Sequence, residues 1–191
     1  MHFVYSFLIS FLFGALMILL VTFVLLFLRA VQVVKGKNEI TNQDRLITNP
    51  LLLLVFASIE ELVARQLLIG VISHYIGLVF AFIVSAAVFT LLHFPNGKIT
   101  FLSVLNLLLV SFLFGIIFVR FGLLAAIGFH YGWNLMQWPI LGYPMYHRNV
   151  GRLLQTKALK REWLSGGEFG PEYSVIATIV LGIFIFDSFI I

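Results

Sequence analysis

The sequence predicts an all-α fold, a polytopic bundle of about six transmembrane helices. Of its 191 residues, 61% are apolar and only 10% are charged, whereas a soluble domain carries about 25% charged residues. The mean hydropathy is +1.08. Apolar stretches long enough to cross a hydrocarbon core of about 30 Å alternate with short polar turns. We therefore expect one integral membrane domain over residues 1–191.

The expected helices follow from these apolar stretches and from the breakers between them. Residues 3–28 carry no charge over 26 residues. A cleaved signal peptide is the competing interpretation, but the stretch is too long and no basic residue precedes it. Proline and glycine punctuate the rest of the chain. The six expected helices cover residues 3–28, 50–73, 78–93, 101–119, 123–138 and 173–191.

The polar block 145–172 separates the last two expected helices. Apolar residues recur in it at near-helical spacing between basic ones, which predicts a short amphipathic helix at the membrane surface. A glycine-rich stretch over 165–171 predicts a flexible loop after it. The amphipathic pattern consists of Leu153, Leu154, Ala158, Leu159 and Trp163.

The basic residues predict the orientation in the membrane. Ten of the 12 lysines and arginines lie in the loops after the first, third and fifth helices, which the positive-inside rule places in the cytosol, with both termini outside. Arg120 is the feature against this orientation. The aromatic residues Trp133, Trp138, Tyr143 and Tyr146 predict an interfacial belt.

Composition also limits the functional classes and the location. The chain has no cysteine, which excludes disulfides, thiolate catalysis and cysteine-ligated metal. Its net charge of +4 resides mostly in loops between apolar spans, so we expect no nucleic-acid partner and instead contact with anionic lipid. Without an ER-retention signal or a large soluble domain, we expect a prokaryotic cytoplasmic membrane.

Three charges lie inside the expected helix 50–73, namely Glu60, Glu61 and Arg65. Each ionised group at the bilayer centre costs about 2.5–3.5 kcal/mol, so such groups pair, face a wet cavity or do chemistry. Adjacent residues point about 100° apart on a helix, so the two glutamates have different roles. Glu61 and Arg65 are spaced i,i+4 and predict an ion pair, which leaves Glu60 to act as a general base toward water.

Two further helices carry polar groups at overlapping depth. His130 and Asn134 share one face of the helix 123–138 and are able to donate hydrogen bonds to an oxyanion. A structural interhelical hydrogen bond is the other interpretation of these two. His93 ends the helix 78–93 nearer the cytosolic face, so it meets Glu60 only where the helices tilt or a cavity opens to the cytosol.

These residues form three ordered motifs: Glu60-Glu61-Leu-Val-Ala-Arg65, then Phe89-Thr-Leu-Leu-His93, then His130-Tyr-Gly-Trp-Asn134. In this order they resemble the EExxxR, FxxxH and HxxxN motifs of the CPBP family. That family unites CAAX prenyl endopeptidases of the Rce1 type with bacteriocin-processing and immunity proteins. The resemblance covers roughly residues 50–139, and the remaining helices and the basic loop 145–172 lie outside it.

The resemblance implies an intramembrane endopeptidase with an Rce1-like core that cleaves a membrane-associated peptide, prenylated or of leader type. It implies that Glu60 and His93 activate a water and that His130 and Asn134 stabilise the oxyanion. Structural support is implied for Glu61, Arg65 and Phe89. We expect the site to face the cytosolic half of the membrane.

Two alternatives stay open at the level of sequence. We expect no cofactor, but Glu60, His93 and His130 are of the residue types that bind zinc, which gives a metalloprotease instead. The second alternative is a non-catalytic immunity or regulatory protein that binds another membrane protein. It predicts that Glu60→Gln leaves function intact.

Overall fold

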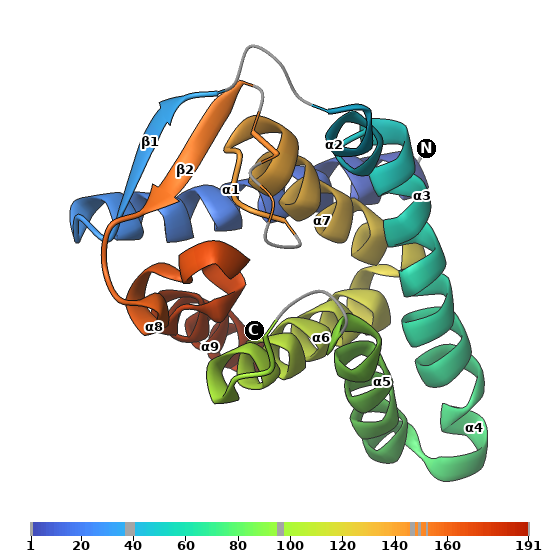
Figure 1. The fold of residues 1–191 in the computed structure, drawn as a ribbon. Helices are drawn as coiled ribbons and strands as arrows, with labels where there is room; N and C mark the ends of the chain where they lie inside the picture. The colour runs from blue at the N-terminus through green and yellow to red at the C-terminus, as the bar shows by residue number, and fades with distance from the viewer. Residues whose placement is uncertain are drawn as a thin grey trace.

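The computed structural model describes residues 2–36, 41–94, 98–145, 148, 150–151 and 153–190, and it is mostly helical (Figure 1). Most helices are α-helices, η1 and η3 are π-helices, and η4 and η5 are 3₁₀ turns. In chain order the elements are α1 (His2–Phe27), β1 (Val31–Lys35), α2 (Asn42–Ile47), α3 (Pro50–Glu61), η1 (Leu62–Val71), α4 (Ser73–Ile76), α5 (Leu78–His93), α6 (Phe101–Phe121), α7 (Leu123–Leu135), η3 (Met136–Ile140), β2 (Leu154–Ala158), α8 (Glu162–Ser165), η4 (Gly167–Phe169), η5 (Pro171–Tyr173) and α9 (Val175–Ile190).

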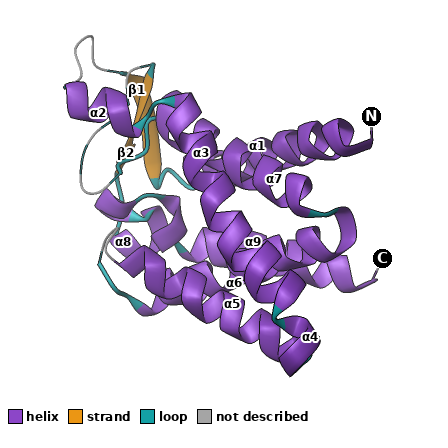
Figure 2. Cartoon of the chain, turned by 90° about the vertical axis from the view of Figure 1, so that its right-hand side faces the viewer, coloured by secondary structure: helices purple, strands orange, loops and turns teal. Residues whose placement is uncertain are grey.

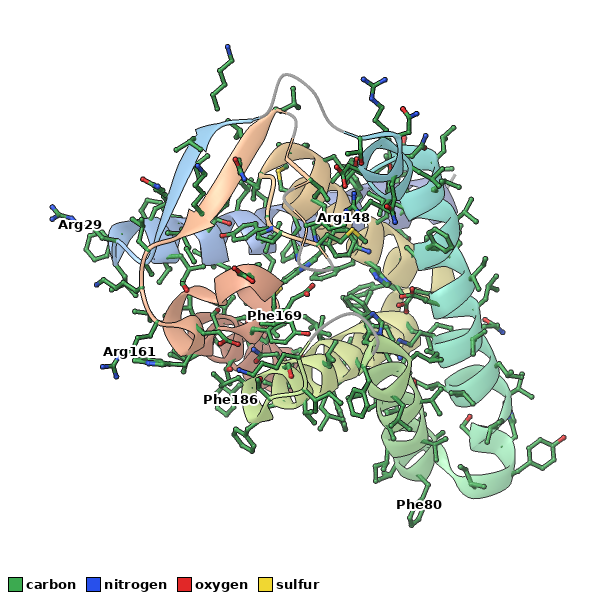
Figure 3. All side chains as sticks on the ribbon, in the orientation of Figure 1. Arg29, Phe80, Arg148, Arg161, Phe169 and Phe186 are labelled. Atoms are coloured by element: carbon green, nitrogen blue, oxygen red, sulfur yellow. The ribbon has the colours of Figure 1, made fainter. Side chains whose placement is uncertain are left out.

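Helices occur at all six predicted positions, and α5 has the predicted bounds. Within the described residues, two helices are long and apolar enough to cross a membrane, Val4–Phe27 and Phe101–Phe121. Leu78–His93 and Val175–Ser188 are shorter apolar helices. Large apolar side chains cover the outside, and Phe80 and Phe186 point away from the molecule (Figure 3). A soluble protein rarely exposes so much contiguous apolar surface.

Close backbone contact joins α1 to α7 in the core (Figure 1). A Cβ atom on Gly128 would lie 2.4 Å from the backbone oxygen of Phe7, and one on Gly132 would lie 2.1 Å from that of Phe11. Gly14 meets the Phe129 backbone in the same way. Small residues four apart let helix backbones approach in membranes. This contact fixes the part of α7 that carries His130.

The motif-bearing helices α3 and α7 both pass into π-helix beside their motifs. The run α3, η1 and α4 corresponds to the predicted helix 50–73, with the change directly after Glu61. There the hydroxyl of Ser85 donates to the Ala64 carbonyl at 2.6 Å. In η3, Pro139 removes one backbone donor. Such π segments widen the helix and are frequent at functional sites.

The predicted amphipathic helix in the block 145–172 is wrong. Residues 154–158 form β2, which pairs antiparallel with β1 so that Val31 lies opposite Ala158. The buried Thr156 anchors the strand, since its hydroxyl donates to the Leu141 carbonyl at 2.7 Å. The ladder partners lie 119 to 127 residues earlier in the chain, so local spacing of apolar residues did not reveal them.

The predicted flexible loop 165–171 is instead a series of turns. Gly166 and Gly170 adopt φ of +82° and +91°, which favour glycine, between α8, η4 and η5. Figure 2 shows both ends of the chain on one side of the molecule, with the sheet and α2 on the opposite side. Arg29 and Arg161, near the sheet, point away from the body of the protein (Figure 3).

Candidate active site

Glu60 and Glu61, adjacent in sequence, occupy opposite environments. The Glu61 side chain is 0% exposed, whereas that of Glu60 is 34% exposed and lines a cavity of about 300 Å³. The difference follows from the helical offset between neighbouring residues. The sequence prediction that the two carboxylates address different points agrees with this geometry.

Glu61 and Arg65 form the predicted ion pair, with Arg65 Nε 3.0 Å from Glu61 Oε2. The Arg65 Nη1 group donates to the hydroxyls of Ser85 and Ser111 at 2.7 and 3.0 Å. The guanidinium also lies over the ring of Phe89, 5.0 Å from its centroid. A fully buried charge survives only with such compensation. Phe89 thus contacts the charge network, as its predicted supporting role requires.

The imidazole of His130 bridges the two glutamates. Its Nδ1 lies 2.9 Å from Glu61 Oε1, and its Nε2 lies 3.6 Å from Glu60 Oε2. Because Glu61 is paired with Arg65 and accepts hydrogen bonds, Nδ1 carries a proton. His130 therefore donates from Nε2 only as an imidazolium. This constraint bears on any role as an oxyanion donor.

His93 reaches Glu60 from the end of α5. Its Nδ1 lies 2.8 Å from the Phe89 carbonyl oxygen and its Nε2 lies 3.8 Å from Glu60 Oε2. The Phe89 ring stacks on the His93 ring at 4.3 Å between centroids and also contacts His130. The shallow position expected for His93 does not prevent convergence, because the cavity extends to it.

Asn134 lies one turn beyond His130, lines the same cavity and is buried. Within the described part of the chain, its amide makes no side-chain hydrogen bond. A residue that only joined helices would have a partner across the interface. The amide is therefore available to a group that enters the cavity.

The wall of the cavity contains aromatic residues that we expected at the membrane interface. Trp133 is 3% exposed and Trp138 also lines the cavity, while Tyr143 is buried and donates to the Thr22 hydroxyl at 3.1 Å. The burial of Trp133 and Tyr143 contradicts a lipid-facing belt at these two positions, Trp138 is partly exposed, and Tyr146 lies outside the described residues. The direction in which each side chain points decides its environment, and composition alone does not predict that direction.

The rim of the cavity joins α2 to the segment after η3. Ile47, Pro144 and Met145 line it. Arg148 Nε donates to Asp44 Oδ1 at 2.8 Å, and Asp44 also belongs to the capping box of α2 with Thr41. Figure 3 shows Arg148 near α2. Burial acts to raise the pKa of Asp44, but hydrogen bonds from Arg148 and Thr41 outweigh it and lower that pKa.

The geometry also bears on the zinc alternative. Both imidazoles turn Nε2 toward Glu60 while an acceptor holds Nδ1, an orientation that metal ligands share. Among the residues that the structure describes, however, no group of three or more His, Asp or Glu side chains is arranged to hold a metal ion. The metal dependence stays a question for chelation.

The family described as type II CAAX prenyl endopeptidase, Rce1-like, matches residues 42–136. The chain belongs to the Rce1-like family. The match contains all three motifs, from Glu60 to Asn134, and the family is one of CAAX-type membrane proteases. No curated protein and no solved structure matches the chain. The match ends before β2, η5 and α9.

Sequence reasoning missed one charged residue of the cavity, Glu172 in η5. It lies outside the family match, at the end of the polar block 145–172 and directly before the expected helix 173–191. The only indication in the sequence is an acidic residue directly before an apolar span. That indication is weak, because interfacial charges beside spans are common.

Proposed function

We propose that this protein is an intramembrane endopeptidase that hydrolyses a peptide bond of a membrane-associated substrate, prenylated or of leader type, with a water activated by Glu60. One observation carries the proposal: a cavity-facing carboxylate lies between two imidazole Nε2 atoms while its neighbour Glu61 is buried in an ion pair. The Rce1-like match supports the reaction class.

In the proposed reaction Glu60 removes a proton from water, and His93 orients that water. The resulting hydroxide attacks the carbonyl carbon of the scissile bond. Glu60 then returns the proton to the leaving amine as the C–N bond breaks, so that atoms and charges balance. The products are a free carboxylate and a free amine.

His130 and Asn134 stabilise the oxyanion in this proposal. Asn134 donates from its unpartnered amide, and His130 donates from Nε2 as an imidazolium. The Glu61 carboxylate at 2.9 Å holds the other imidazole proton. Arg65 holds Glu61 in place through their ion pair and so acts on His130 through it. Glu61 and Arg65 are positioning residues.

We further propose six membrane spans, with the site toward the cytosolic half of a prokaryotic cytoplasmic membrane and both termini outside. The two ends of the chain lie on the same side of the molecule, which supports an even number of spans (Figure 2). Arg120, the basic residue on the opposite side from most others, donates to the Ser188 carbonyl near the end of α9. A cation at a helix C-terminus is stabilising, which accounts for its position.

The test is cleavage of a quenched-fluorescence library of membrane-anchored peptides, prenylated and plain, by purified protein in detergent. Glu60→Gln should lower the rate about 10²–10⁴-fold, the usual contribution of a general base. Glu168→Gln is the matched control, since Glu168 is exposed and absent from the cavity wall. It should cleave at the wild-type rate.

Three other outcomes would count against the proposal. If chelation abolished cleavage and one divalent metal restored it, Glu60, His93 and His130 would be ligands of a zinc ion in a metalloprotease. Equal rates for Glu60→Gln and wild type would remove Glu60 from the chemistry. No cleavage of any peptide by folded protein would favour the non-catalytic immunity or regulatory alternative.

A further inference from the structure

A second carboxylate, Glu172, lies on the cavity wall away from the three motifs. It comes from η5, between the turns that follow β2 and the start of α9. Glu60 and Glu172 are the charged acidic residues of this wall, and no described lysine or arginine lines it. The ionisable groups of the described cavity wall are therefore two carboxyl groups and two histidines.

The fold fixes the backbone at Glu172. Asn106, buried in α6, donates to the carbonyls of Glu172 and Ser174 at 2.7 and 3.0 Å, and its own oxygen accepts from Thr178 at 2.7 Å. The Ser174 hydroxyl donates to the Pro171 carbonyl and caps the start of α9. Both the amide nitrogen and the amide oxygen of Asn106 are therefore hydrogen-bonded to this segment. A buried amide with all its polar atoms bonded in this way holds the backbone of the segment in place.

Two polar side chains, Trp133 and Gln137, and the imidazole of His130, whose charge acts to lower the pKa of Glu172, lie near this carboxylate. The Trp133 indole donates to the Gln137 amide oxygen at 2.5 Å, and the Gln137 amide nitrogen, fully buried, has no hydrogen-bond partner among the described residues. Burial raises the pKa of Glu172, and the polar groups of Trp133 and Gln137 partly offset that rise. No described lysine, arginine or histidine forms an ion pair with Glu172.

Aromatic rings flank this carboxylate on the cavity wall. Trp133, Phe169 and Tyr173 all line the cavity, and the rings of Phe169 and Tyr173 lie 4.9 Å apart. Phe169 lies in the middle of the molecule, between the C-terminal turns and α7 (Figure 3). A carboxylate without a cationic partner, beside aromatic faces, attracts an ammonium or guanidinium group by charge and by cation–π contact.

We propose that Glu172 forms a subsite for a cationic side chain, lysine or arginine, of the peptide substrate. The subsite rests on the proposed function, because it assigns part of the same cavity to the substrate. Glu172 determines specificity and takes no part in the bond-breaking step. A substrate with a basic residue near its scissile bond then binds with that residue beside Trp133 and Tyr173.

Binding tests this without turnover. Fluorescein-labelled membrane-anchored peptides carry lysine or its uncharged analogue norleucine at successive positions, and their anisotropy is measured with Glu60→Gln protein. At one position lysine should bind about tenfold tighter, the usual worth of a charged hydrogen bond. Adding Glu172→Gln should bring the ratio to about one, whereas adding Glu168→Gln should leave it unchanged.

Two further variants guard against a merely structural effect. Glu172→Asp should retain a lysine preference, and Glu172→Lys should prefer glutamate over glutamine at the same position. The lysine–norleucine comparison on the Glu60→Gln protein needs no change at Glu172 at all. A lysine preference that survives Glu172→Gln, or its absence at every position, would overturn the subsite.

The two proposals fail separately. Lysine-dependent binding without cleavage of any peptide would leave the subsite in place and remove the proposed reaction. Cleavage that depends on Glu60 but ignores lysine would do the reverse.

Discussion

The two walls of the cavity hold their charges in different ways. The motif wall, formed by α3, η1, α5 and α7, pairs each charge with another one: Arg65 with Glu61, Glu61 with His130, and Glu60 with both histidines. The C-terminal wall, formed by α6, η5 and α9, presents Glu172, which forms no ion pair with a described residue. Each charged group of the motif wall already has a partner within the protein. Glu172 on the C-terminal wall is available to pair with a cation from outside the protein.

This contrast has an energetic basis. A buried ion pair gains Coulomb energy but loses hydration, and breaking it strands a charge at high cost. A carboxylate held by amide and indole groups loses hydration with less return. A cation that arrives with substrate restores that loss. The motif wall is therefore suited to holding catalytic geometry and the C-terminal wall to selecting what enters.

The largest effect is expected on the motif wall. Arg65→Met leaves the Glu61 carboxylate buried without its cation, which should destabilise the protein by about 3–5 kcal/mol. Thermal unfolding in detergent measures this. The double variant Glu61→Gln/Arg65→Met removes both charges and should recover much of the loss. Equal stability of single and double variants would show that the pair is not the source of the cost.

A smaller effect is expected on the C-terminal wall. Asn106→Leu leaves the Glu172 carbonyl without its donor, at about 1–3 kcal/mol, whereas the Ser174 carbonyl still accepts from Thr178 at 3.4 Å. The lysine preference of the binding assay should fall while norleucine peptides bind as before. Thr178→Val is the matched control, because it removes a partner of Asn106 without freeing either carbonyl. An unchanged lysine preference would separate Asn106 from the subsite.

The two walls also differ in how far the sequence predicts them. Glu60 and His130 lie at overlapping expected depths, so their approach follows from period and depth. His93 was expected nearer the cytosolic face, and only the motif resemblance implied that it meets Glu60. The π segments after Glu61 and Leu135 were not predicted from the sequence pattern. They coincide with local features, a hydrogen bond from Ser85 in the first segment and the ring of Pro139 in the second.

β2, Glu172 and the burial of Trp133 were not predicted, for a different reason. β2 depends on pairing with β1, and Glu172 depends on Asn106, 66 residues earlier. Neither of these two long-range contacts produces a periodic pattern of residues that the sequence would reveal. Trp133 was likewise predicted at the membrane interface, because tryptophan is common there. Its position on α7 instead directs the side chain toward the cavity. Long-range contacts, and not local propensity, decide these residues.

The smallest effect is expected at the rim, where Asp44 and Arg148 join α2 to the segment beside Met145. The folded pKa of Asp44 lies below its ordinary value of 3.8, so the folded state binds this proton less readily than the unfolded state. The stabilisation is therefore complete above about pH 4 and disappears as the pH falls through the folded pKa. Arg148 is partly exposed, which limits the effect to about 1 kcal/mol or less.

Asp44→Asn removes this charge and keeps one of the two acceptors, either the oxygen that accepts from Arg148 or the one that accepts from the Thr41 N–H. The unfolding temperature of the variant in detergent should lie slightly below that of wild type between pH 5 and pH 7, a window about one unit or more above the ordinary pKa. The two should converge as the pH falls below about 4, where wild-type Asp44 takes up its proton. A difference that stays constant into acid would assign the loss to altered capping of α2, and the ion pair would then contribute nothing to closing the rim.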